Sequence, residues 1–123
     1  MNARSFEELW IWQEARLLVK QIYQDFGNQS KVASDFGFRS QIQRAGVSIM
    51  NNIAEGFERL SDVEFCRFLK IAKGSCGEVR SMYYTAEDLE YVTPAQASQR
   101  RGSARKISAG INSLINHLRA KTL

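Results

Sequence analysis

The sequence is poor in residues that interrupt helices and in residues that carry most catalysis. It contains a single proline, which together with long amphipathic stretches favours helices over an architecture of strands and turns. His117 is its single histidine, and a histidine so near the end of a chain is most often a solvated helix-end residue. A Ser-His-Asp or Cys-His arrangement would have to use it, so we expect a protein that is not an enzyme.

Long apolar runs and paired cysteines are also missing. No stretch approaches the roughly 18 apolar residues of a membrane span, and Glu7 and Glu8 lie where a signal peptide needs its apolar region. Cys66 and Cys76 would lie about 15 Å apart along one helix, which is too far for a disulfide within the chain. The sequence therefore predicts reduced thiols, a cytoplasmic location and no contact with a membrane.

Patterns that hold metals or phosphate groups are absent as well. No two histidines or cysteines have ligand spacing, and Glu55 with Glu58 lacks the histidine of the Glu-x-x-His motif found in metal-binding bundles. The segment Gly74-Ser-Cys-Gly77 lies inside a predicted helix rather than after a strand, so it does not make a nucleotide cradle. We expect no metal, no cofactor and no small-molecule substrate.

What the sequence does contain is 44% hydrophobic residues in long helical patterns, enough for the core of one domain. Apolar residues recur at helical spacing, predicting four helices at about 5–26, 35–60, 62–92 and 94–119. The short connections between them predict an all-α, up-down-up-down four-helix bundle.

Helix start signals set these boundaries. Ser5 with Glu8 and Ser61 with Glu64 have the spacing of a capping box, and Ser34 or Asp35 can cap the second helix. The fourth helix has an N-cap at Thr93, Pro94 at its first position and a capping-box Gln96. Because Arg100 falls in its apolar stripe and Gly102 follows, we expect this helix to fray or break before Ser103. Gly74 and Gly77 in the third helix predict the close approach of another backbone.

The first two helices carry more apolar surface than one packing contact requires. Each has a second apolar stripe away from its core face, which implies further neighbours from the same chain or from another subunit. We therefore predict a stable homo-oligomer whose interface includes these stripes. Their residues are Phe6, Trp10, Leu17, Val47, Met50 and Phe57.

Polar residues flank the core faces of the second and third helices on corresponding sides. If the helices pack antiparallel, the two columns meet and form a polar ladder of Gln41, Ser48, Asn52, Glu55, Arg59, Glu64, Ser75 and Glu78. We favour a structural role, because networks of buried polar groups can fix helix packing. A ligand site or active site in the same ladder is the alternative.

Positive charge is concentrated at the end of the chain. Residues 1–90 carry 11 basic and 13 acidic side chains, whereas residues 91–123 carry six basic and no acidic ones. Arg101, Arg105 and Arg119 share one face of the fourth helix and predict a track for a phosphate backbone. A second basic set lies on the third helix away from its core face, namely Arg67, Lys70, Lys73 and Arg80. A charged stripe is often only a solvated face, which is the alternative interpretation.

Several motifs occur together in a form that resembles a known bacterial family. They include Phe6-Glu-Glu-Leu9-Trp-Ile-Trp12, Asn52-Ile-Ala-Glu-Gly56 and Ile71-Ala-Lys-Gly-Ser75. They resemble the four-helix-bundle proteins first noticed as products of intervening sequences within 23S rRNA genes. The accessory variability determinant of diversity-generating retroelements is a more distantly similar bundle. The first connection departs from the pattern, since Gly27 to Lys31 replaces the family's Phe-Pro and acidic residue.

The resemblance implies a homo-oligomer, typically a pentamer, in which nucleic-acid binding is the main functional hypothesis. Two classes of function follow for this chain. One is a non-enzymatic assembly that binds RNA or DNA with low sequence specificity through its basic surface. The other is a structural or adaptor oligomer that binds another protein through apolar or acidic surface, for instance around Glu87, Asp88 and Glu90.

Overall fold

The structure is a computed structural model that describes residues 2–27 and 31–122. Within those residues it is all-α, with four α-helices and no strand. The helices are α1 (Trp10–Asp25), α2 (Phe36–Phe57), α3 (Asp62–Asp88) and α4 (Pro94–Thr122), and two short 3-10 helices, η1 (Phe6–Glu8) and η2 (Lys31–Ser34), precede α1 and α2. Part of the first connection, residues 28–30, lies outside the described residues.

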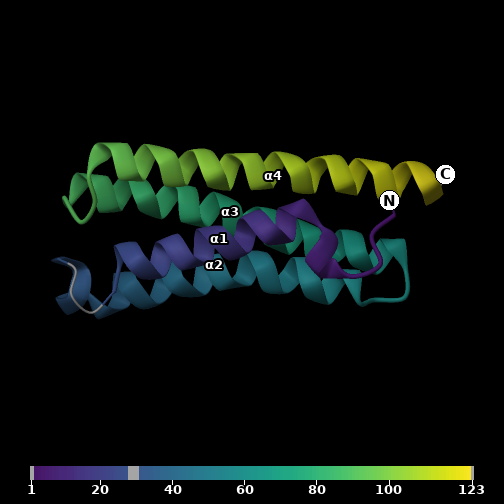
Figure 1. The fold of residues 1–123 in the computed structure, drawn as a ribbon, viewed down its shortest axis with the longest axis horizontal. Helices are drawn as coiled ribbons and strands as arrows, with labels where there is room; N and C mark the ends of the chain where they lie inside the picture. The colour runs from purple at the N-terminus through teal and green to yellow at the C-terminus, as the bar shows by residue number, and fades with distance from the viewer. Residues whose placement is uncertain (1, 28–30, 123) are drawn as a thin grey trace.

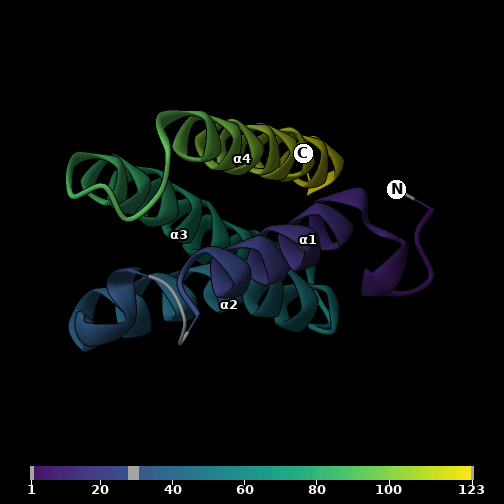
Figure 2. The ribbon, with the colours of Figure 1, turned by 60° about the vertical axis from the view of Figure 1, so that its left-hand side comes forward.

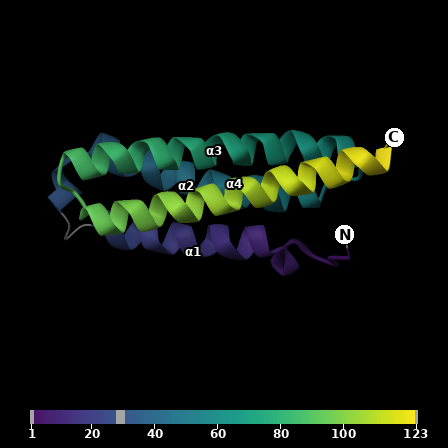
Figure 3. The ribbon, with the colours of Figure 1, turned by 90° about the horizontal axis from the view of Figure 1, so that it is seen from above.

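Consecutive helices run in opposite directions, as the predicted up-down-up-down order requires (Figure 1). Figure 2 shows α1 and α2 side by side, with α3 between α2 and α4. Seen from above, α4 runs obliquely from the end of α1 towards the start of α3 (Figure 3). α4 therefore packs against both α3 and α1.

One continuous apolar core joins the four helices. Its largest fully buried side chains come from all of them and from η2, and include Tyr83, Phe26, Leu18, Ile22, Ile42, Ile49, Ile53, Leu69, Ile107, Ile111, Leu118 and Val32. Phe26 packs edge-on against Phe38, with ring centroids 5.4 Å apart, and at the same distance from Tyr83. These aromatic contacts tie α2 and α3 to the end of α1.

Three of the predicted caps are formed. The Asp35 carboxylate accepts from Phe38 N at 3.2 Å, and Ser61 Oγ accepts from Glu64 N at 3.2 Å. At the start of α4, Gln96 N donates to Thr93 Oγ1 and Thr93 N donates to Gln96 Oε1, the reciprocal pair of a capping box. These bonds fix where α2, α3 and α4 begin.

The first helix begins later than predicted. Ser5 caps no α-helix; it precedes η1, and Leu9 then adopts an extended conformation before α1 starts at Trp10. This interruption lets Leu9 enter the core and brings the Phe6 ring against Trp12, with centroids 5.2 Å apart. Burial of apolar side chains thus outweighs continuation of the helix.

The ends of α2, α3 and α4 also differ from the prediction. α2 ends at Phe57, and α3 ends at Asp88, where Glu90 takes a left-handed φ of 58° and Tyr91 N donates to Ala86 O at 2.8 Å. This is a Schellman-type stop without its usual glycine, so no residue at this point marks the end of the helix in the sequence. The predicted break before Ser103 is wrong, because α4 runs unbroken through Gly102.

Glycines show where backbones come close. A Cβ on Gly46 would lie 2.6 Å from Ile22 Cδ1, and one on Gly56 would lie 2.7 Å from Phe68 Cβ. By contrast, a Cβ on Gly74 or Gly77 would meet nothing within 4 Å among the described residues. The predicted close approach at those two glycines is therefore not made by any described part of this chain.

Candidate nucleic-acid interface

Parts of the two predicted basic sets lie where α3 and α4 face each other. Arg101 of α4 donates to Glu87 of α3 at 2.9 Å, which marks the sides on which the two helices face each other. Arg80 and Lys73 precede Glu87 by seven and fourteen residues, so helical spacing brings them to the same side of α3. Arg119 follows Arg101 by five full turns on α4. We call the combined set the basic seam, which comprises Arg67, Lys70, Lys73, Arg80, Arg101, Arg105 and Arg119.

The start of α3 and the end of α4 line a hollow that contains members of both sets. This cationic hollow has a volume of about 170 Å³ and is lined by Asp62, Val63, Cys66, Arg67, Lys70, Leu118 and Arg119. Three cationic side chains thus surround a space that could receive a phosphate group. The backbone N–H groups at the start of α3 add partial positive charge at the same end.

Acidic groups already engage part of the seam. Arg67 pairs with Glu64 at 3.0 Å, but both side chains are well exposed, so this contact is weak and easily exchanged. The Lys121 ammonium lies 3.8 Å from the Asp62 carboxylate at the mouth of the cationic hollow, and it partly neutralises the negative charge there. The end of the seam near Arg119 therefore carries an excess of positive charge.

Arg101 is the member least available to a ligand. Its side chain is only 15% exposed, it pairs with Glu87, and its guanidinium carbon lies 4.1 Å from the centroid of the Tyr84 ring. Arg80 is half-buried, and its Nε is shielded without a hydrogen-bond partner among the described residues. Lys70, Lys73 and Arg105 are exposed. The cations at the Arg67 and Arg119 end are thus more exposed than Arg101.

The polar ladder forms only in part between helices. Ser75 Oγ donates to Ser48 Oγ at 2.9 Å, and Gln41 Nε2 donates to a Glu78 oxygen, so two rungs join α2 to α3. Asn52 Nδ2 donates to Ser48 Oγ at 3.0 Å and to Ser48 O at 2.8 Å within α2. The Ser75–Ser48 and Gln41–Glu78 contacts join positions on the facing sides of α2 and α3.

Glu55 and Arg59 lie at the exposed end of the ladder. They pair with each other at 3.1 Å along α2, and the Arg59 guanidinium lies 4.6 Å from the centroid of the Phe68 ring on α3. Since both charged side chains are about half exposed, the pair resembles an ordinary surface ion pair. The structural interpretation of the ladder stays a prediction, with its strongest support at Ser48 and Ser75.

The apolar residues predicted for a subunit interface are partly covered within the chain. Met50, Phe57 and Phe6 pack against the core, and Val47 is half-buried. Phe57 packs against Phe65 of α3, with ring centroids 5.9 Å apart, and Gly46, next to Val47, faces Ile22 of α1. Trp10 and Leu17 remain about half exposed, so the apolar excess that predicted an interface is smaller than the sequence suggested.

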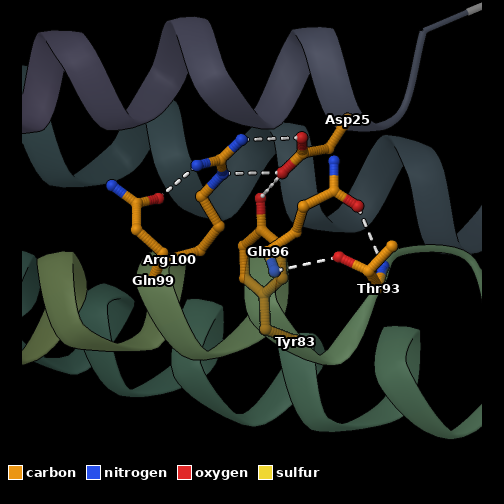
Figure 4. Close-up of polar contacts among 6 residues, drawn as sticks. All are labelled: Asp25, Tyr83, Thr93, Gln96, Gln99 and Arg100. Carbon is orange, nitrogen blue, oxygen red and sulfur yellow. Dashed lines mark hydrogen bonds and ion pairs between the residues drawn. The ribbon is translucent and has the colours of Figure 1, made fainter.

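A buried charged cluster near the end of α1 escaped sequence analysis (Figure 4). The Asp25 carboxylate accepts from Arg100 Nε at 2.8 Å, from Arg100 Nη2 at 3.0 Å and from Tyr83 Oη at 2.7 Å. Burial, and then the neighbouring Asp25 carboxylate, raises the pKa of Tyr83 far above its usual range. The cluster joins α1, α3 and α4, and it explains why Arg100 sits in an apolar stripe without breaking α4.

The described residues show no arrangement typical of a metal site or of a reactive cysteine. They contain no group of three or more His, Cys, Asp and Glu side chains that could hold a metal ion. Cys66 and Cys76 are both buried and unpaired with each other, and burial raises the pKa of the Cys76 thiol to about 12 despite Lys73 and Arg80 nearby. His117 lies on the exposed surface of α4. None of the described helices is long and apolar enough to cross a bilayer.

Comparisons with known proteins agree with this architecture. The family model of the 23S rRNA-intervening sequence protein matches residues 7–113. A crystal structure of a protein of unknown function from the S23 ribosomal protein family of Bacteroides thetaiotaomicron superposes with a TM-score of 0.77 at 24% identity, covering 85% of this chain and 97% of that one. No curated protein matches. Neither description indicates a catalytic function.

Proposed function

The chain belongs to the family of 23S rRNA-intervening sequence proteins, and on this premise we propose that it is a non-enzymatic protein that binds nucleic acid, RNA or DNA, in the cytoplasm. Binding uses phosphate contacts along the basic seam and has low sequence specificity. It needs no metal, cofactor or small-molecule substrate.

The observation that carries this proposal is the cationic hollow. Arg67 and Lys70 come from α3 and Arg119 comes from α4, yet all three line one space of about 170 Å³. Arginine presents a planar fork of donors that suits phosphate oxygens, and lysine adds a flexible point charge. Such contacts hold a nucleic-acid backbone without reading its bases, because bases are read by groups that reach their edges.

The test compares two variants that remove the same charge from different surfaces. Arg67→Ala, Lys70→Ala and Arg119→Ala together empty the cationic hollow. The matched control removes three exposed cations from α1 and α2, Arg16, Lys20 and Arg44, and lowers the net charge equally. Fluorescence anisotropy with structured RNA, single-stranded DNA and duplex DNA at several salt concentrations gives the affinity and its salt dependence.

We expect the cationic-hollow variant to bind more weakly and with a flatter salt dependence. Each lost phosphate contact lowers the slope of log affinity against log salt by about 0.9 on duplex DNA and about 0.7 on single strands. The slope should therefore fall by about 2 to 3, and the control should keep nearly the wild-type slope. Equal losses in both variants would show a diffuse charge effect, and a wild type that binds nothing at low salt would refute the proposal.

A structural or adaptor oligomer is the second candidate, and exposed apolar side chains favour it. Leu60, Val63 and Ile71 are each more than half exposed, near the start of α3 and on its outer surface. One turn beyond Ile71, Gly74 leaves open space where another backbone could approach. We propose self-association through this surface, as a pentamer by family resemblance. Sedimentation showing only a 14.0 kDa monomer at micromolar concentration would contradict it.

A further inference from the structure

We infer that the groove between α1 and α4 holds an unpaired nucleobase stacked on Trp10, so that the protein prefers single-stranded to duplex nucleic acid. This inference rests on the proposed function and names the form of nucleic acid that it binds. The site is a second hollow, which we call the aromatic hollow. It is lined by Leu9, Trp10, Ile11, Gly110, Ser113, Leu114 and His117.

Trp10, the first residue of α1, packs against α4 at Gly110. A Cβ on Gly110 would lie 2.4 Å from Trp10 Cζ2 and 2.7 Å from Ile11 Cγ2, so α1 can approach α4 this closely because residue 110 is glycine. Even so, Trp10 remains 47% exposed. The indole is thus fixed at one edge by α4 while much of its surface faces solvent, as in an aromatic platform on which a base stacks.

The size and lining of the aromatic hollow suit one planar aromatic group. Its volume is about 330 Å³, near the lower end of the roughly 300 to 1,000 Å³ of small-ligand sites. Leu9, Ile11 and Leu114 provide apolar surface, and Ser113 adds a hydroxyl able to hydrogen-bond a base edge. A base in a duplex is already stacked and paired, so an unpaired base is the form that can enter.

Charge around the aromatic hollow favours a polyanion over an apolar partner. Lys106 Nζ lies 5.7 Å from the centroid of the Trp10 ring, and the acidic group beside it is Glu14, at 3.7 Å from the ammonium. Of the basic residues of α4, Arg100 and Arg101 are paired with Asp25 and Glu87, but Arg105, Lys106 and Arg119 are exposed, and α4 has no acidic residue of its own. A strand that places its base here therefore meets a positive surface for its phosphates.

The aromatic hollow and the cationic hollow lie on two sides of the same part of α4. His117 lines the first, and the next two residues, Leu118 and Arg119, line the second. A bound strand has to cross only one helix, whose diameter with side chains is about 10 to 12 Å. Phosphate contacts on the basic seam and a base on Trp10 can thus belong to one continuous strand.

The test measures affinity for a single-stranded oligonucleotide and for the same sequence as a duplex. Trp10→Ala should weaken single-strand binding by roughly 5- to 150-fold, the loss caused by removing one stacking aromatic, and should leave duplex binding nearly unchanged. Trp10→Phe should retain most of the affinity. Leu17→Ala is the matched control, because Leu17 lies seven residues along the same side of α1, is 50% exposed and is outside the aromatic hollow.

A second variant and a second readout guard against loss of folding. Ser113→Leu fills the aromatic hollow without removing Trp10, and it should weaken single-strand binding in the same way. In a Trp12→Phe background, Trp10 is the remaining tryptophan, and its fluorescence should be quenched by the oligonucleotide and not by the duplex. Circular dichroism confirms that each variant is folded.

Each other outcome overturns the inference in a recognisable way. If Trp10→Ala leaves single-strand affinity unchanged while the cationic-hollow variant weakens it, the inference fails and the proposed function stands. If Trp10→Ala instead changes the sedimentation of the protein without changing affinity, Trp10 belongs to a subunit interface. Equal losses for single strands and duplexes show that Trp10 does not discriminate between them. Absence of any binding by the wild type ends both proposals.

Discussion

The buried pair of Asp25 and Arg100 gives the sharpest prediction for stability. The Asp25 side chain is 3% exposed and the Arg100 side chain 15%, and two charge-assisted hydrogen bonds join them. Arg100→Met removes both bonds and keeps an apolar chain of similar length. Among the described residues, the carboxylate then keeps the hydrogen bond from Tyr83 alone, and a buried charge without its partner is strongly destabilising.

Known buried pairs set the magnitude, because removing one partner typically costs 3 to 5 kcal/mol. We expect Arg100→Met to lower the free energy of unfolding by about 3 kcal/mol, the lower end, since Arg100 is not fully enclosed. A chain of 123 residues has an unfolding entropy near 0.26 kcal/mol/K. The melting temperature should therefore drop by about 12 °C, as measured by calorimetry and by urea unfolding.

The neighbouring arginine provides a matched control. The Arg101 side chain is also 15% exposed and also pairs with a carboxylate, but its partner Glu87 is 32% exposed. Arg101→Met should cost about 1 kcal/mol or less, because water can solvate the carboxylate that remains. Replacing both members of the buried pair, with Asp25→Leu and Arg100→Met, should restore much of the loss. Equal effects of Arg100→Met and Arg101→Met would refute the argument from burial.

Four further predictions concern other positions. Gly56→Ala should destabilise the fold by about 1 to 3 kcal/mol in urea unfolding, because the added methyl would lie 2.7 Å from another side chain, whereas Gly74→Ala should stabilise it by up to about 1 kcal/mol. Because the pKa of Tyr83 is raised in the folded protein, the phenol loses its proton at a lower pH in the unfolded chain than in the folded one. The free energy of unfolding should therefore fall by up to about 1.4 kcal/mol per pH unit above pH 10. This fall should be smaller in Tyr83→Phe. With its pKa near 12, Cys76 should resist iodoacetamide at pH 8.5 until the chain unfolds, as mass spectrometry can show. Glu55→Ala should change stability by less than about 1 kcal/mol in thermal unfolding, because its ion pair is exposed.

The sequence was most informative where a local rule decides the structure. The caps at Asp35, Ser61 and Thr93 depend on residues three or fewer positions apart, and all three are formed. Ser5 has the same local pattern and fails, because burying Leu9 requires an extended residue at the point where the helix would continue. Tertiary packing thus outweighed the local capping pattern of Ser5 and Glu8.

The sites were harder to predict, because they depend on which helices become neighbours. The basic residues of the third and fourth helices were identified as two separate sets, and periodicity alone could not show that Arg67 and Arg119 line the same hollow. The aromatic hollow was missed for the same reason. From the sequence, Trp10 was predicted to belong to a subunit interface, and its contact with Gly110 of α4 is visible only in the structure.

The Asp25 cluster did leave a signal, and it lay in two exceptions to the apolar pattern. Asp25 follows Leu18 and Ile22 along the core stripe of α1, and Arg100 interrupts the stripe of α4. In an up-down-up-down bundle the end of the first helix and the start of the fourth lie at the same end, so two opposite charges in core positions there should pair. An isolated charge in a core stripe costs too much to be left unpaired, and a complementary charge at the matching level of another helix is its simplest explanation. Applied to Arg100, that reasoning predicts the continuity of α4 as well as the ion pair, because a paired arginine gives the helix no reason to break.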